Sequence, residues 1–156
     1  MQLIPPRGRL IGVDFGTVRI GLAVCDPDRR IASPLETYTR RSPAADAAAF
    51  RRLAEQEQAV GWVVGLAVHM TGEEGSKARE CRAFGEWLRQ QTGLPVAFQD
   101  ERCTTAEAEA YLLAAGLTSK RRKDRRDRIA AQLILQSFLD ADKRSMFPKE
   151  TQKRDG

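Results

Sequence analysis

Asp14 is the residue with the clearest chemical potential in this sequence, because it interrupts an apolar segment, Leu-Ile-Gly-Val-Asp-Phe (residues 10–15). An ionised carboxylate inside a buried strand is costly unless it is paired or bound to a cation. Gly12 and Gly16 carry no side chains, so a ligand or another stretch of backbone can approach this carboxylate closely. The pattern favours a metal or phosphate site at the end of a central strand. The alternative is a turn aspartate that caps backbone amides.

Two further carboxylates are expected to reach the same place. Glu101 closes a short predicted strand at residues 95–99, and the carboxyl ends of parallel strands share one edge of a sheet. Asp127 precedes Ala130 and Ala131 by three and four positions, which places it on the inward-facing stripe of the last predicted helix. Its alternative role is that of an acid complementing the helix dipole in the first turn.

We expect these three carboxylates to bind Mg²⁺ or Mn²⁺, because hard cations prefer oxygen ligands. Such a site suits the hydrolysis of phosphodiester bonds, with one bound ion or with two. Asp124 lies one turn before Asp127 and is better explained as a helix cap than as a fourth ligand. The three cysteines and the single histidine lack the spacing of a zinc site, so the thiols are expected to be free.

The densest charge cluster, Lys-Arg-Arg-Lys-Asp-Arg-Arg-Asp-Arg (residues 120–128), includes the third carboxylate. Its cations would repel one another unless a polyanion binds there, so we expect a nucleic-acid substrate; the alternative is a solvated loop. Aromatic residues are scarce here, so recognition is expected through backbone and shape. The expected phosphate contacts, partly in a loop at residues 117–123, are Arg19, Arg102, Lys120, Arg121, Arg122 and Lys123.

The pattern of elements predicts an α/β fold, a mixed five-stranded sheet flanked by helices. Three strands joined by short turns form an antiparallel meander, and Pro34 marks the third as an edge strand. Later strands alternate with helices, which indicates parallel crossovers. The predicted strands are residues 10–15, 19–24, 31–39, 62–68 and 95–99. Four helices are predicted. The first begins at Ser42-Pro43 and is ended by Gly61, and the other three lie at residues 76–91, 104–115 and 124–143.

The chain of 156 residues has the length of one domain and a formal net charge of +5. We expect a loose N-terminal segment at residues 1–8, one catalytic domain at residues 9–144 and a disordered, charged tail at residues 145–156. No apolar run approaches the ~20 residues of a membrane span, and the first nine residues lack the apolar core of a signal peptide. The expected location is cytoplasmic, without a membrane partner.

Four motifs, in order along the chain, resemble the YqgF family. They are Gly-Val-Asp-Phe-Gly-Thr-Val-Arg-Ile-Gly-Leu-Ala (residues 12–23), Val-Val-Gly-Leu (residues 63–66) with Gly72, Asp-Glu-Arg-Cys-Thr-Thr (residues 100–105) and Asp-Arg-Ile-Ala-Ala-Gln-Leu-Ile-Leu-Gln (residues 127–136). The resemblance implies a ribonuclease-H-like fold, a divalent metal, a nucleic-acid substrate and an acidic active site formed by Asp14, Glu101 and Asp127. Ala67, His69 and Cys103 depart from the usual family pattern, the first two in the loop at residues 67–75.

The YqgF family is described as the nuclease that helps to mature the 5′ end of pre-16S rRNA, and was also proposed as a Holliday junction resolvase. We therefore expect a metal-dependent endonuclease in ribosome biogenesis, with resolution of branched DNA as the alternative. A non-catalytic RNA-binding assembly factor is a further alternative, against which three intact acids argue. Actin-like ATPases and sugar kinases share an Asp-Phe-Gly-Thr turn but need two lobes, for which this chain is too short. A monomer and a homodimer are both compatible with the sequence; symmetric junction cutting would favour the dimer.

Overall fold

A mixed five-stranded sheet forms the centre of the computed structural model, which describes residues 3–67, 74–101 and 119–146. The strand order is β3-β2-β1-β4-β5. β1–β2 and β2–β3 pair antiparallel, whereas β1–β4 and β4–β5 pair parallel, which confirms the predicted meander and crossovers. The strands are β1 (Arg9–Asp14), β2 (Arg19–Cys25), β3 (Ala32–Thr39), β4 (Ala59–Leu66) and β5 (Val96–Asp100).

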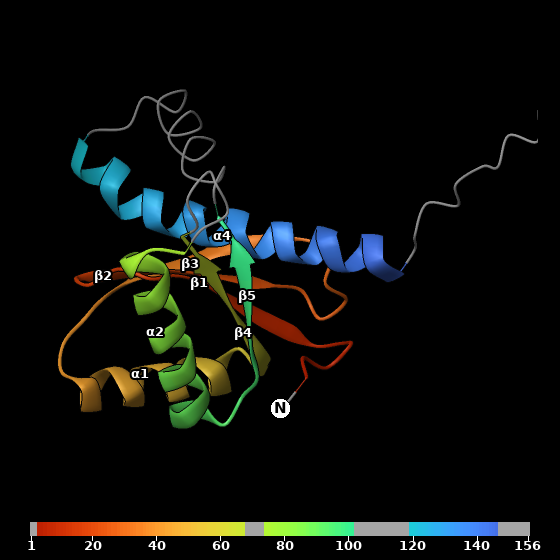
Figure 1. Ribbon diagram of the computed structural model, residues 1–156, viewed down its shortest axis with the longest axis horizontal. Coiled ribbons are helices and arrows are strands. Elements are labelled where there is room, and N and C mark those ends of the chain that lie inside the picture. The colour runs from red at the N-terminus through yellow and green to blue at the C-terminus, as the bar shows by residue number, and fades with distance from the viewer. Residues whose placement is uncertain (1–2, 68–73, 102–118, 147–156) are drawn as a thin grey trace, which may run out of the picture.

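Helices cover both faces of this sheet (Figure 1). α1 (Pro43–Gln56) and α2 (Ser76–Thr92) pack on one face, and α4 (Ser119–Met146) crosses the other and contacts all five strands. Strands covered on both faces explain why the central sequence segments are apolar throughout. Within the described ranges, no helix is long and apolar enough to cross a membrane.

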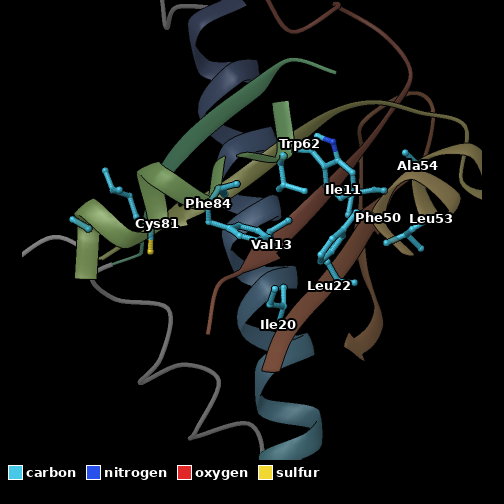
Figure 2. Close-up of a cluster of buried hydrophobic side chains, with 14 residues drawn as sticks. Ile11, Val13, Ile20, Leu22, Phe50, Leu53, Ala54, Trp62, Cys81 and Phe84 are labelled. Carbon is cyan, nitrogen blue, oxygen red and sulfur yellow. The ribbon is translucent and has the colours of Figure 1, made fainter. Parts of the chain in front are cut away.

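Alternating side chains of β1 divide the interior into two cores. Ile11 and Val13 belong to the core beneath α1 and α2, where Phe50 packs edge-on against Trp62 with ring centroids 5.8 Å apart (Figure 2). Leu10 belongs to the core beneath α4. Asp14 lies four residues after Leu10 in the same strand, so its side chain points to the same face of the sheet, the one that α4 covers.

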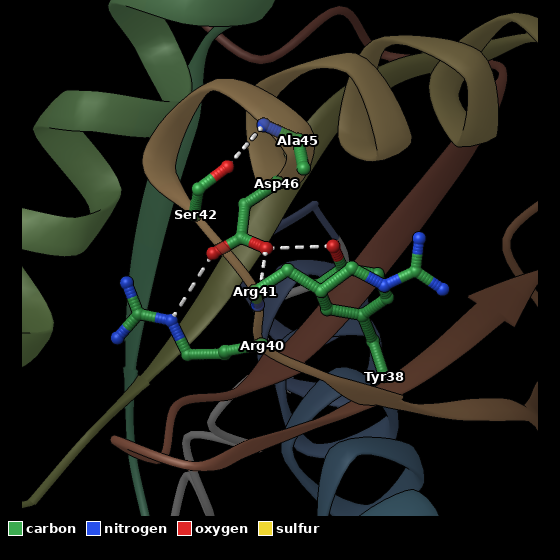
Figure 3. Close-up of polar contacts among 6 residues, drawn as sticks. All are labelled: Tyr38, Arg40, Arg41, Ser42, Ala45 and Asp46. Atoms are coloured by element: carbon green, nitrogen blue, oxygen red, sulfur yellow. Dashed lines mark hydrogen bonds and ion pairs between the residues drawn. The ribbon is translucent and has the colours of Figure 1, made fainter.

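A buried carboxylate fixes the start of α1 to the end of β3. Ser42 caps the helix by accepting a hydrogen bond of 3.2 Å from the Ala45 amide, as predicted. Asp46 accepts hydrogen bonds from the Tyr38 hydroxyl at 2.6 Å and the Arg41 amide at 2.9 Å (Figure 3). Burial alone would raise the pKa of Asp46, but these bonds and Arg40 hold it below its usual value.

The predicted end of α1 at Gly61 is wrong. The helix ends at Gln56, Gln58 adopts a left-handed φ of 52°, and β4 begins at Ala59. Gly61 therefore lies inside the strand, where a Cβ atom would approach the Ile4 Cδ1 atom to 2.8 Å. The glycine serves close packing in the sheet rather than helix termination.

The predicted start of the last helix is also wrong. α4 begins at Ser119, so most of the expected basic loop at residues 117–123 is helical. Lys and Arg are good helix formers, and their repulsion does not prevent helix formation here. Outside the described residues lie the predicted helix at residues 104–115, Arg102, His69, Cys103 and residues 147–156 of the expected tail. The first two residues of that tail, 145 and 146, are helical, because α4 continues to Met146.

Candidate active site

Two carboxylates meet at one edge of the sheet. Asp14 is the last residue of β1, and Glu101 directly follows β5. The Glu101 amide still donates a hydrogen bond of 3.2 Å to the Leu66 carbonyl, so it continues the pairing of β5 with β4. β1, β4 and β5 run parallel, which brings their carboxyl ends together as the sequence predicted. The Asp14 and Glu101 side chains are hydrogen-bonded to each other.

The pKa of Asp14 is strongly perturbed. Burial, the largest cause, and the negative charges of Glu101 and Asp127 together raise this pKa from 3.8 to about 7. The positive charges of Lys77 and Arg126 act in the opposite direction. Burial also raises the pKa of Glu101. In the absence of a metal, Asp14 therefore keeps its proton to a higher pH than an ordinary aspartate does.

Glycines bring α4, and with it Asp127, close to the sheet. A Cβ atom on Gly21 of β2 would lie 1.9 Å from the Asp127 carbonyl oxygen. A Cβ atom on Gly12 would lie 2.8 Å from the carbonyl oxygen of Ala131, one turn further along α4. Only glycine permits this approach of a helix backbone to a strand. Ala130 and Ala131 are buried, in agreement with the predicted inward phase of the helix.

Asp127 forms an ion pair with an arginine at the start of β2. Its Oδ2 atom lies 3.4 Å from the Arg19 Nε atom at the start of β2. Among the described residues, no three His, Cys, Asp or Glu side chains are grouped so as to hold a metal ion. The arrangement is thus a hydrogen-bonded pair, Asp14 and Glu101, with Asp127 nearby and ion-paired to Arg19.

The chemistry of these donors nevertheless suits a hard divalent cation. All three supply carboxylate oxygens, and the described cysteines, Cys25 and Cys81, are free thiols buried in the cores. Gly65 keeps space open beside Glu101, because a Cβ atom there would lie 2.6 Å from the Glu101 Oε2 atom. A cation would also offset burial, the main cause of the raised pKa of Asp14, and the repulsion from Glu101 and Asp127 that adds to it.

The expected phosphate contacts are only partly visible. Arg19 lies at the site, paired with Asp127. Arg102 lies outside the described residues, as do the side chains of Lys120, Arg121, Arg122 and Lys123, whose backbone forms the first turns of α4. Sequence reasoning missed Lys77, whose charge acts on both Asp14 and Glu101. Its position just after a glycine-rich loop, at the start of α2, was the available signal.

Comparison with known sequences gives one consistent result. The RuvX family, described as Holliday junction resolvase, matches residues 8–141. A protein of Rhodopirellula baltica provisionally named pre-16S rRNA nuclease is 49% identical over 137 residues, which are 88% of this chain and 79% of that protein. A protein of Cereibacter sphaeroides with the same provisional name is 45% identical over 137 residues, covering 88% of this chain and 86% of that protein.

Solved structures of resolvases share the fold. Thermus thermophilus RuvC in complex with a Holliday junction gives a TM-score of 0.54 at 15% identity, covering 87% of this chain and 96% of that chain. Fowlpox virus resolvase with its junction DNA gives a TM-score of 0.52 at 8% identity, covering 85% and 97%. The ribonuclease-H-like fold implied by the sequence motifs is confirmed.

Proposed function

The chain belongs to the RuvX Holliday junction resolvase family and is a nuclease, and from that premise we propose that it is a divalent-metal-dependent endonuclease that cleaves the 5′ leader of pre-16S rRNA. The carrying observation is the pair of carboxyl groups, Asp14 and Glu101, hydrogen-bonded at the sheet edge with Asp127 beside them. The pKa of Asp14, raised to about 7, supports this proposal because strongly perturbed pKa values cluster at functional sites. A bound cation would supply the positive charge that stabilises the ionised carboxylate.

Each acid has a defined role in this proposal. Asp14 and Glu101 at the sheet edge and Asp127 on α4 would hold the cation, for which Asp127 would have to leave Arg19. The chemistry supplied by a bound Mg²⁺ or Mn²⁺ is polarisation of the phosphate and activation of a water molecule. Arg19, once released, can pair with a phosphate of the substrate. The protein fixes these groups on rigid elements before the substrate arrives.

The substrate assignment rests on the relatives. Those at 43–49% identity are provisionally named for pre-16S rRNA, which favours RNA processing in ribosome biogenesis. The family description favours a second candidate, resolution of Holliday junctions. Both substrates are polyphosphates and fit the cation-rich start of α4.

A direct test compares cleavage of a pre-16S 5′-leader RNA and a four-way DNA junction with Mg²⁺, with Mn²⁺ and with EDTA. We expect cleavage of the RNA that depends on the metal and falls at least ~10²-fold in Asp14→Asn, which retains the shape of the side chain. Asp28→Asn changes an exposed aspartate in the turn after β2 and serves as the matched control. Paired nicks in the junction alone would support the resolvase, and binding without cleavage of either substrate would support an assembly factor.

A further inference from the structure

A pocket of about 320 Å³ lies next to the turn that follows Asp14 and has no role in the function proposed above. It lies between the turn that follows Asp14 and the first turns of α2. This volume is at the lower end of the range for small-ligand sites. The lining residues are Phe15, Gly16, Thr17, Ser76, Lys77 and Glu80.

The walls of the pocket carry groups that suit a phosphate. Thr17 and Ser76 contribute hydroxyl groups, and Lys77 contributes an ammonium group that can donate three hydrogen bonds. Gly16 holds the turn tight, because a Cβ atom there would lie 2.2 Å from the Arg19 carbonyl oxygen. The turn that lines the pocket is therefore fixed relative to both Asp14 and Arg19.

Lys77 is exposed and lines the pocket. In the described part of the chain it forms no direct ion pair, even though Glu80 lines the same pocket three residues later. Its positive charge partly offsets the rise in the pKa values of Asp14 and Glu101, so the ammonium group lies near both acids. A cation close to the acids but not paired with one of them can bind an incoming phosphate.

We propose that this pocket, with Lys77 as its cation, binds a backbone phosphate next to the phosphate that is cleaved. The inference rests on the proposed nuclease function. It makes Lys77 a positioning residue: the lysine holds the strand one nucleotide away from the reacting bond, and the carboxylates act on the bond itself. Backbone phosphates are common to RNA and DNA, so the pocket contributes affinity and register but no base preference.

Salt dependence of binding in EDTA tests this without requiring cleavage. We compare the wild type with Lys77→Gln on a labelled single-stranded leader RNA by fluorescence anisotropy. Loss of one phosphate contact should reduce the slope of log K against log salt by about 0.7 and weaken binding about tenfold. Lys77→Arg should restore the slope. Glu80→Gln should strengthen binding, because it removes a negative charge from the pocket.

Arg79→Gln is the matched control, because it removes one exposed cation from the same helix two positions further along, on a different face. A second measurement replaces single phosphates of the leader RNA with uncharged methylphosphonates. One position adjacent to the cut should weaken wild-type binding and leave Lys77→Gln binding unchanged. No other position should show this difference.

The outcomes separate the two proposals. Equal effects of Lys77→Gln and Arg79→Gln, in an enzyme that cleaves, would overturn the pocket alone. A slope change specific to Lys77 in a protein that never cleaves would overturn the nuclease function and leave the pocket standing. A wild type that binds neither nucleic acid would overturn both.

Discussion

The raised pKa of Asp14 makes metal binding compete with a proton for this carboxylate. Burial and the charges of Glu101 and Asp127 raise its pKa from 3.8 to about 7 in the metal-free protein. A ligating carboxylate must lose its proton, so metal binding should release a proton near neutral pH and tighten as the pH rises. Lys77 and Arg126 moderate this cost without cancelling it.

The same pKa predicts how stability depends on pH. Between pH 3.8 and 7 the unfolded chain loses the Asp14 proton while the native protein keeps it, so native stability falls as pH rises. Asp14→Asn cannot ionise. Relative to the wild type, it should therefore gain about 2–3 kcal/mol in unfolding free energy between pH 5 and pH 8. Urea denaturation in EDTA measures this difference, and a constant difference across that range would contradict the assignment of the pKa.

Arg19 competes with a metal for Asp127. Their ion pair of 3.4 Å is partly exposed, with 35% and 20% of the two side chains accessible. Replacing Arg19 with Gln removes the competitor and a positive charge near the site. Mn²⁺ affinity, measured by calorimetry without substrate, should rise by about fivefold, because one close charge near a protein surface is worth roughly 1 kcal/mol.

Nucleic-acid binding should change in the opposite direction in the Arg19→Gln variant, because a phosphate contact is lost. Arg9→Gln is the control: it removes an arginine from the other end of the sheet, where Arg9 pairs with Glu57 at 3.5 Å. Weaker Mn²⁺ binding by Arg19→Gln would show that the arginine supports Asp127 as a ligand rather than competing with the metal.

At the scale of elements, α4 determines whether the third acid reaches the site. Gly21 lies directly beneath the Asp127 carbonyl oxygen, and an added Cβ atom would approach it to 1.9 Å. Gly21→Ala must therefore displace the helix backbone. We expect a loss of at least about 1–3 kcal/mol in unfolding free energy, together with weaker Mn²⁺ binding.

Gly93→Ala separates these two effects of the Gly21 substitution. Gly93 ends α2 with a φ of 72°, and nothing lies within 4 Å of an added Cβ atom. The alanine should cost about 1 kcal/mol through backbone strain and leave metal affinity unchanged. If Gly21→Ala lost stability but kept wild-type Mn²⁺ affinity, the position of α4 would not control the site.

The periodicity of apolar residues predicted which face of each strand or helix a residue occupies. The helical phase of the last helix predicted that Asp127 would face the sheet, and the order of elements predicted that Glu101 would end a parallel strand at the edge that Asp14 approaches. Periodicity does not specify which side chains meet there. The pairing of Asp127 with Arg19, and the approach of Lys77 from α2, depend on the spacing between elements that glycines set.

The two wrong boundaries have a common physical origin. Gly61 was interpreted as the end of a helix, and the cations at residues 117–123 as a loop before the next one, from local chemistry alone. Gly61 lies inside β4 in close contact with the Ile4 side chain, and Ser119 starts α4 earlier than the charge pattern suggested. In both places tertiary packing or intrinsic helix propensity prevailed over the local signal.

At the scale of the whole molecule, cations gather where the substrate must arrive. The basic run at residues 120–128, which includes Asp127, lies on α4. This helix covers the face of the sheet opposite α1 and α2 (Figure 1). Replacing Arg121, Arg122 and Lys123 together with Gln should weaken binding to RNA and junction alike. The slope of log K against log salt should fall by about 2–3 if each cation neutralises one phosphate.

The variant of Arg121, Arg122 and Lys123 tests whether the position of these cations, rather than the total charge of the protein, determines binding. A control that replaces Arg52, Arg79 and Arg89 with Gln removes the same net charge from α1 and α2. It should change the slope by far less, because exposed charges more than about 10 Å from the bound strand are screened at about 0.1 M salt. Equal slopes for the two triple variants, in anisotropy titrations between about 50 and 200 mM salt, would mean that binding follows net charge alone. A difference between them would place the path of the nucleic acid along α4.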